Sequence, residues 1–153
     1  MKKPVSVSAL EAHLGYWLRF VSNHVSHAFS RKLLARDVTV AEWVILRDLY
    51  DREAAVPSEL AARIGMTRGA ISKLADRLAA KSLVARSADR EDRRYQALAL
   101  TPSGRALVPE LSALADQNDA EFFGVLEPEA RQAIEAAMKE IVRRKTLRGV
   151  PVE

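Results

Sequence analysis

The chain has 153 residues, of which 48% are hydrophobic and 29% are charged, and its net charge is +4. This length suits about one domain, and this composition excludes a disordered chain. The absence of cysteine excludes disulfides, thiolate metal sites and thiol-based redox sensing. The chain has no apolar run long enough to cross a bilayer and no export signal at its N-terminus, so we expect a cytoplasmic protein without a membrane partner.

The positive charge is concentrated in one segment. Residues 56–100 contain nine lysines and arginines and five acidic residues, so this segment accounts for the whole net charge of +4. A solvated surface would be the simplest explanation for such a run. Cations gathered in one segment also favour a polyanionic partner, however.

The first predicted element is a long amphipathic helix over residues 8–34. Ser8 and Glu11 have the spacing of a capping box at its start. Its apolar residues recur every three or four positions, at Leu10, Leu14, Trp17, Leu18, Val21, Val25, Ala28 and Phe29. This stripe is wide, which indicates a helix that buries two faces, one of them against a second subunit.

The next helix is predicted to begin after Thr39, with Glu42 completing a capping box. Ala55 and Val56 are expected to form a very short strand. A helix then starts at Pro57 and ends at Gly65, which supplies the left-handed conformation of a turn. Thr67 caps the following helix, residues 68–81, so this stretch has the pattern of a helix-turn-helix.

Two strand-like segments, 83–86 and 95–100, flank a charged stretch that cannot bury anything, and they predict a hairpin with an exposed tip. Thr101 and Pro102 start a helix over 102–123. Glu127 and Pro128 start the last helix, whose inward residues are expected to be Ile134, Ala137, Met138 and Ile141. The predicted fold is mainly α with a small β-wing.

Residues 58–105 resemble the MarR family of winged helix-turn-helix transcriptional regulators. The matching pieces are SELAARIGMTRGAISKLADRLAAKSLV, DREDRR and LTPSGRAL, and the remaining helices also fit. One difference is Ser82, where the family often has glycine. The resemblance implies one MarR-like domain over 1–153, with a DNA-binding part at 38–101 and dimerisation helices at 8–37 and 102–148. It also implies a homodimer, most often a repressor, on a palindromic operator.

Helix 68–81 would then be the recognition helix. Arg68, Ser72 and Lys73 point the same way, and arginine or lysine can donate to guanine in the major groove. Gly69 would allow the backbone to approach closely. Thr67 would direct backbone N–H groups toward a phosphate, and Arg77 would meet the DNA backbone. An ordinary solvated helix face is the alternative.

The resemblance also gives roles to three residues of the hairpin tip. Arg94 would enter the minor groove, oriented by Asp92 through a charge-assisted hydrogen bond, with Arg90 as the rival for deepest insertion. A purely structural Asp92–Arg94 clasp is the alternative, and both roles can coexist.

The family implies an effector, often an aromatic anion, bound where the dimerisation helices meet the winged part. The residues that could line such a site are His13, Tyr16, Trp17, Phe20 and Trp43. The alternative is that these aromatic residues are simply core. We expect no cofactor.

The remaining functional classes have little support in the sequence. His24 and His27 have a spacing used by metal sites, but no third ligand is evident, so we expect no metal. No phosphate loop or nucleophile motif is present, so we expect no enzyme. The main alternative is a winged-helix module that binds proteins without sequence-specific DNA binding.

Overall fold

The computed structural model describes residues 6–87 and 96–148. The described elements are η1 (Leu10–Ala12), α1 (Leu14–Leu34), α2 (Val40–Tyr50), α3 (Pro57–Ile64), α4 (Arg68–Ala80), β1 (Val84–Arg86), β2 (Leu98–Leu100), α5 (Pro102–Phe123) and α6 (Pro128–Arg144). The prediction of a mainly helical fold with a small hairpin is therefore confirmed.

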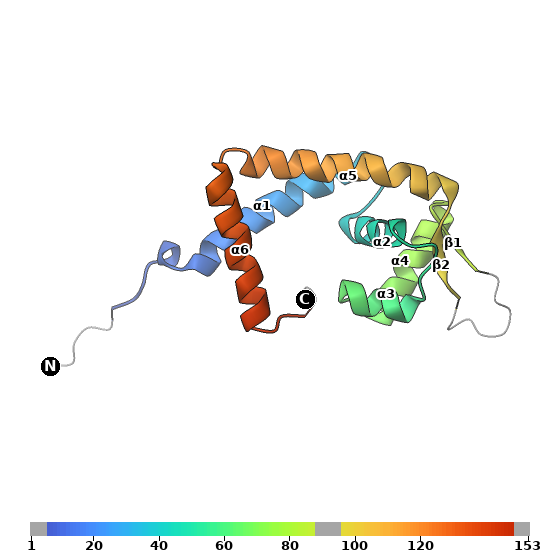
Figure 1. Cartoon of the computed structure of the whole chain (residues 1–153), viewed down its shortest axis with the longest axis horizontal. Coiled ribbons are helices and arrows are strands. Elements are labelled where there is room, and N and C mark those ends of the chain that lie inside the picture. The colour runs from blue at the N-terminus through green and yellow to red at the C-terminus, as the bar shows by residue number, and fades with distance from the viewer. Residues whose placement is uncertain (1–5, 88–95, 149–153) are drawn as a thin grey trace.

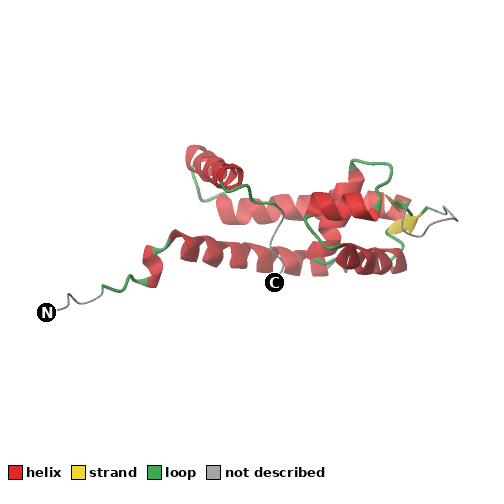
Figure 2. Cartoon of the chain, turned by 90° about the horizontal axis from the view of Figure 1, so that it is seen from below, coloured by secondary structure: helices red, strands yellow, loops and turns green. Residues whose placement is uncertain are grey.

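The molecule has a compact end and an extended end (Figure 1). Helices α2–α4 and the β1–β2 hairpin, here called the winged module (residues 40–100), gather at the compact end. Helix α5 leaves this module and packs against α1. Helix α6 turns back from the far end of α5, and the rotated view separates it from α1 (Figure 2). We call α1 and α6 the arm helices.

The hydrophobic core lies in and around the winged module. Its fully buried apolar side chains are Leu33, Val38, Ile45, Leu46, Leu49, Leu60, Ile71, Leu78 and Leu111. Helix α1 contributes only Leu33 to the buried set, although all of its residues are described. Because the core surrounds α2 and the inner face of α4, packing alone fixes which face of α4 reaches the solvent.

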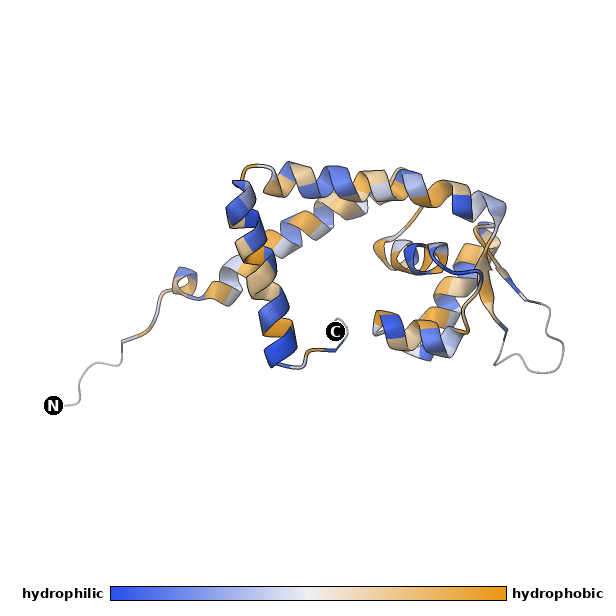
Figure 3. Ribbon diagram, in the orientation of Figure 1, coloured by the Kyte–Doolittle hydropathy of each residue, from blue (hydrophilic) through white to orange (hydrophobic). Residues whose placement is uncertain are grey.

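The arm helices leave apolar side chains exposed, as the orange positions along both helices show (Figure 3). The exposed set includes Leu10, Leu14, Trp17, Leu18, Phe20 and Val21 on the N-terminal side, and Ile134, Met138, Ile141 and Val142 on α6. The expectation that Ile134, Ala137, Met138 and Ile141 point inward is wrong for a single chain. Helix α6, which is described in full, buries none of its residues, because it packs on no other described element over a substantial area.

The start of the first helix also differs from the prediction. A short 3-10 helix ends at Ala12, the next residue His13 is extended (φ −97°, ψ 125°), and α1 begins only at Leu14. The described residues show no side-chain cap at either start, so the capping box expected from Ser8 is wrong. The indole nitrogen of Trp17 donates to the carbonyl of Glu11 at 2.9 Å. This bond satisfies a carbonyl that a continuous helix would have paired.

The three predicted threonine caps are confirmed. The Thr39 hydroxyl accepts from the Glu42 amide, and the Glu42 carboxylate accepts from the Thr39 amide at 2.9 Å, which completes the capping box. Thr67 accepts from the Ala70 amide at 3.1 Å, and Thr101 accepts from the Gly104 amide at 3.0 Å. These caps set the starts of α2, α4 and α5.

The connection from α4 to β1 depends on a left-handed residue. Ser82 has φ 58°, its amide donates to the carbonyl of Ala79, and the Leu83 amide donates to the carbonyl of Leu78. This is the Schellman arrangement that glycine favours at a helix end. Serine therefore adopts here the backbone conformation that explains the family's preference for glycine.

The LTPSG stretch closes the winged module against α5. The Thr101 hydroxyl donates to the carbonyl of Ser82 at 2.6 Å. A methyl group on Gly104 would clash with the carbonyl oxygen of Leu83, so only glycine lets α5 approach so closely.

The hairpin is antiparallel, with Val84 opposite Leu100 and Arg86 opposite Leu98. The very short strand expected at Ala55 and Val56 is reduced to an isolated bridge between Ala55 and Leu98. Both strands are shorter than the predicted 83–86 and 95–100. Residues 88–95, which contain Arg90, Asp92 and Arg94, lie outside the described residues.

Candidate nucleic-acid interface

Helix α4 has one buried and one exposed face. Ile71, Leu74, Ala75 and Leu78 are buried in the core. The exposed positions include all six that the sequence predicted for DNA contact on this helix: Thr67, Arg68, Gly69, Ser72, Lys73 and Arg77. The structure therefore brings these six residues together on one continuous surface.

The turn before α4 presents the start of this helix to the solvent. Gly65 is left-handed (φ 78°), and the amides of Gly65 and Met66 both donate to the carbonyl of Ala61. Thr67 then occupies the N-cap and is exposed. Backbone N–H groups at a helix N-terminus carry a partial positive charge, so this end of α4 suits a phosphate.

The acidic residue on the exposed face of α4 has a cationic partner. Arg86 on β1 donates to Asp76 at 2.7 Å and lies 3.5 Å from the carbonyl of Ser72. This pair offsets the negative charge of Asp76 and ties the hairpin to α4. Sequence reasoning missed this contact, because the two residues lie on different elements and share no periodic pattern.

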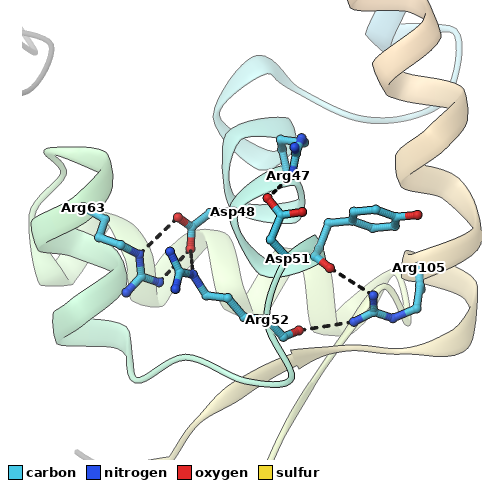
Figure 4. Close-up of polar contacts among 7 residues, drawn as sticks. Arg47, Asp48, Asp51, Arg52, Arg63 and Arg105 are labelled. Atoms are coloured by element: carbon cyan, nitrogen blue, oxygen red, sulfur yellow. Dashed lines mark hydrogen bonds and ion pairs between the residues drawn. The ribbon is translucent and has the colours of Figure 1, made fainter.

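A second ion pair holds α3 on α2 (Figure 4). Arg63 donates two hydrogen bonds to Asp48, at 2.7 and 3.1 Å, and Arg52 lies 3.4 Å from the same carboxylate. The hydrogen bond from Arg63, followed by the charges of Arg63 and Arg52, lowers the pKa of Asp48, although partial burial acts in the opposite direction. The first helix of the helix-turn-helix, α3, is thereby tied to α2.

Arg105 on α5 also helps to hold α2 in place. Its guanidinium donates to the carbonyls of Tyr50 at 3.0 Å and Arg52 at 3.2 Å, and it lies over the ring of Tyr50 (Figure 4). These carbonyls come at the end of α2, where helical partners run out. Arg105 therefore caps α2 and links it to α5.

The far end of α4 is held by a charge pair whose acidic member is buried. Lys81 lies 3.0 Å from the carboxylate of Glu42 and donates to the carbonyl of Asp37 at 2.6 Å. Glu42 is almost completely buried on α2. Neither residue was predicted as part of the site, since a contact between residues 39 positions apart has no local signal in the sequence.

The residues expected around an effector fall into two groups. Tyr16, Trp17 and Phe20 form an aromatic cluster on α1, with ring centroids 5.2–6.4 Å apart, and His13 lies just before it. Trp43 instead packs edge-on against Phe29 beside the core, at 6.3 Å. Within one chain the structure does not bring Trp43 and the α1 cluster together.

An open pocket lies elsewhere at the junction of α2 and α5. Its volume is about 330 Å³, and its lining is Arg47, Tyr50, Val108, Pro109, Ser112, Ala113 and Asp116. Arg47 donates to Asp51 at 2.7 Å beside this pocket. Sequence reasoning missed it, because its walls come from residues more than 50 positions apart.

Comparison with known proteins identifies this arrangement. Residues 38–95 match the sequence profile of the MarR family. Residues 38–95 therefore form a MarR-family winged helix-turn-helix segment. The match covers the helix-turn-helix and extends into the hairpin.

Relatives of this chain are regulators. The HTH-type transcriptional regulator SarZ of Staphylococcus haemolyticus is 27% identical over 115 residues, which cover 75% of this chain and 78% of SarZ. The fold matches BpsR of Bordetella bronchiseptica, whose DNA binding is regulated by 6-hydroxynicotinic acid, with TM-score 0.78, 28% identity and coverage of 89% of this chain and 98% of BpsR. It also matches CouR from Rhodococcus jostii RHA1 bound to p-coumaroyl-CoA, with TM-score 0.75, 25% identity and coverage of 88% and 95%.

The family match settles the class of protein. The chain is a transcriptional regulator rather than an enzyme, as predicted from the sequence. None of its described helices is long and apolar enough to span a membrane. Within residues 6–87 and 96–148, no three His, Asp or Glu side chains are grouped so that they could hold a metal ion.

Proposed function

We propose that this chain is a cytoplasmic, homodimeric repressor that binds a palindromic operator in duplex DNA. The observation that carries this proposal is the exposed face of α4, where Arg68, Ser72 and Lys73 lie together above a buried apolar face. The major groove of DNA admits a helix, and residues near the start of that helix reach the base edges.

The residues of this face would contact different parts of the DNA. Arg68 and Lys73 would donate to guanine, and Ser72 would contact a base or a phosphate. Gly69 would admit the DNA backbone, since a methyl group there would meet no described atom within 4 Å and the position is open to the solvent. Thr67 and Arg77 would contact phosphates. Arg94, with Asp92 beside it, and Arg90 would extend the interface into the minor groove.

The arm helices support the dimer. Their exposed apolar side chains recur along α1 and α6, and apolar surfaces left uncovered on a single chain mark contact sites. A second copy of the chain supplies an identical apolar surface, as two-fold symmetry requires. Two winged modules would then face two half-sites about 34–36 Å apart on the operator.

An aromatic anion would be the effector. BpsR and CouR, at 28% and 25% identity, are associated with an aromatic acid and an aromatic acyl-CoA. In this chain the pocket between α2 and α5 offers the cation of Arg47 and the ring of Tyr50. The cluster of Tyr16, Trp17 and Phe20 with His13 is the second candidate, completed by the partner subunit. The effector acts only if it binds the two dimer states with different affinity.

Selection of bound duplexes from a random DNA pool at about 0.15 M salt tests the DNA-binding proposal. An inverted repeat with half-sites about 10 bp apart is the expected product. Lys73→Ala should cost about 1–3 kcal/mol on that operator and relax one base position per half-site. Lys139→Ala is the matched control, since Lys139 is exposed on α6 and pairs with Glu135. Recovery of no motif would favour the protein-binding alternative.

The effector proposal has a separate test. We expect 6-hydroxynicotinic acid or p-coumarate to release the selected duplex, and Arg47→Gln to weaken that release without changing DNA affinity. If Arg47→Gln changes nothing but Phe20→Ala weakens release, the effector binds at the α1 cluster. Release by neither compound would contradict the proposed ligand class.

A further inference from the structure

Four elements meet at the C-terminal end of α4. Lys81, which follows the last helical residue, donates to the carbonyl of Asp37 at 2.6 Å and to the carboxylate of Glu42 at 3.0 Å. Asp37 lies in the turn between α1 and α2, and Glu42 lies in the first turn of α2. The Thr101 hydroxyl at the start of α5 binds the next residue, Ser82, through its carbonyl at 2.6 Å.

The electrostatic part of this junction centres on the buried carboxylate of Glu42. The side chain of Glu42 is 2% exposed and that of Lys81 is 26% exposed. A buried carboxylate requires a partner, and here the Thr39 amide and the Lys81 ammonium supply it. The carboxylate of Asp37 lies 3.7 Å from the same ammonium. Three oxygens thus lie within 3.7 Å of the Lys81 nitrogen.

The backbone around the junction is also constrained. Asp37 (φ 54°) and Ser82 (φ 58°) both adopt the left-handed conformation, which places a tight turn on each side of the Lys81 contacts. Gly104 lies against the carbonyl of Leu83 in the same place. The end of α4 is therefore tied to the starts of α2 and α5, while its other end is the one that would face DNA.

Because α4 is long, a small rotation of the helix about this junction would displace its N-terminal end. Helix α4 has 13 residues and Lys81 follows the last of them, so Arg68 lies about 20 Å from Lys81. A rotation of about 10° about the Lys81 end would move the N-terminal end by about 3.4 Å, which is the spacing of successive base pairs. An error of this size would shift a recognition helix by one base pair relative to its half-site.

We propose that Lys81 is a positioning residue that fixes the tilt of α4 against α1, α2 and α5, and thereby sets the spacing of half-sites that the dimer accepts. This inference rests on the proposed DNA-binding function. It assigns to Lys81 no contact with DNA. The cation of Lys81 acts through Glu42 and Asp37, whereas Arg68 and Lys73 act on the bases directly.

The test compares operators that differ only in spacing. The selected duplex is prepared with its own half-site spacing and with the spacing one base pair shorter or longer, and affinity is measured by fluorescence anisotropy. For the unmodified chain we expect a loss of about 10-fold when the spacing changes by one base pair. For the double variant Lys81→Met/Glu42→Gln we expect a loss of only about 2–3-fold.

Two control variants separate positioning from DNA contact and from a general loss of charge. Lys73→Met should weaken binding at every spacing but keep the 10-fold ratio. Lys139→Met should change neither quantity, since its ion pair with Glu135 lies within α6. The salt dependence of binding is the second readout: a phosphate contact would lower its slope by about 0.9 per residue lost, and a positioning role leaves it unchanged.

The double variant avoids leaving one buried charge unpaired, so we expect it to fold, as circular dichroism would report. Glu42→Gln alone, which keeps an acceptor for the Thr39 amide, should give an intermediate spacing penalty and serves if the double variant unfolds. An unchanged spacing penalty in both variants would overturn the inference, as would a lower salt slope with an unchanged penalty. Failure of the unmodified chain to select any operator would instead overturn the proposed function, and this inference with it.

Discussion

The winged module and the arm helices differ in how far a single chain buries their apolar side chains. Leu46 in α2 is 0% exposed and is surrounded by its own chain, whereas Ile141 on the apolar face of the amphipathic helix α6 is 46% exposed. The winged module therefore completes its core within one chain, and the arm helices do not. The comparison teaches that the amphipathicity of a helix reveals that a face will be buried, but not which chain will cover it.

The largest expected effect contrasts the two regions directly. Leu46→Ala should cost about 2–5 kcal/mol of unfolding free energy, because it leaves a cavity in a core that cannot collapse fully. Ile141→Ala should cost little in dilute protein and more as the protein concentration rises, because a partner must cover this residue first. Urea unfolding at two protein concentrations measures both. Equal costs for Ile141→Ala at the two concentrations would contradict the contrast.

The next effect concerns the seam where the winged module meets α5. Gly104→Ala should destabilise the chain by about 2–3 kcal/mol, because the added methyl group would press on the carbonyl of Leu83. Gly69→Ala is the control within the same module, since its methyl group would meet no described atom, and it should raise stability by up to about 1 kcal/mol. Thermal unfolding of both variants would show whether close approach, rather than loss of glycine, matters.

A smaller effect tests the clamp between α2 and α3. Asp48, whose side chain is 17% exposed, receives two hydrogen bonds from Arg63, so Asp48→Asn should cost about 1–2 kcal/mol at pH 7. Asp51→Asn should cost less than about 0.5 kcal/mol, since its partner Arg47 lies four residues away on an exposed surface.

The same clamp predicts a pH dependence. The pKa of Asp48 is lowered in the folded state, so its contribution is fully present above the unfolded-state pKa of about 3.9. The contribution is lost as the pH falls from there through the lower folded-state pKa. The stability difference between the unmodified chain and Asp48→Asn should therefore shrink at pH values below about 3.9. A difference that stayed constant down to pH 2 would rule out this ionic clamp.

The smallest effect is a gain. Ser82→Gly should stabilise the winged module by about 0.5–1 kcal/mol, because glycine adopts the left-handed conformation of the α4 end without strain. Ser103→Gly, in the first turn of α5, should instead cost about 0.5 kcal/mol. Differential scanning calorimetry can resolve the opposite signs. A loss of stability for Ser82→Gly would mean that the serine side chain has a role of its own.

The elements of the winged module could be predicted because their signals are local. Thr39, Thr67 and Thr101 are each the N-cap of a helix and bind the amide three residues later, and Gly65 marks the turn between two helices. The exposed positions of α4 followed from the apolar spacing on its other face. The break at His13 was missed, because it depends on the indole of Trp17 reaching back to Glu11.

The links between elements could not be predicted in the same way. The ion pairs Glu42–Lys81, Asp48–Arg63 and Asp76–Arg86 form only when the elements that carry these residues have packed together. From the sequence alone, each of these side chains would be expected to be an ordinary solvated charge on the surface. The inward orientation expected for α6 failed for a different reason, since its pattern is correct for burial but the single chain provides nothing to cover it.

The two tryptophans give each region its own optical signal. Trp17 lies on α1 and is 48% exposed, while Trp43 lies on α2 beside the core and Phe29. The chain contains no other tryptophan. In a Trp43→Phe variant, emission should shift to the blue when the arm is covered, and in a Trp17→Phe variant it should report only the unfolding of the winged module. Assembly and unfolding of this regulator can thus be recorded separately in one fluorimeter without attaching a dye.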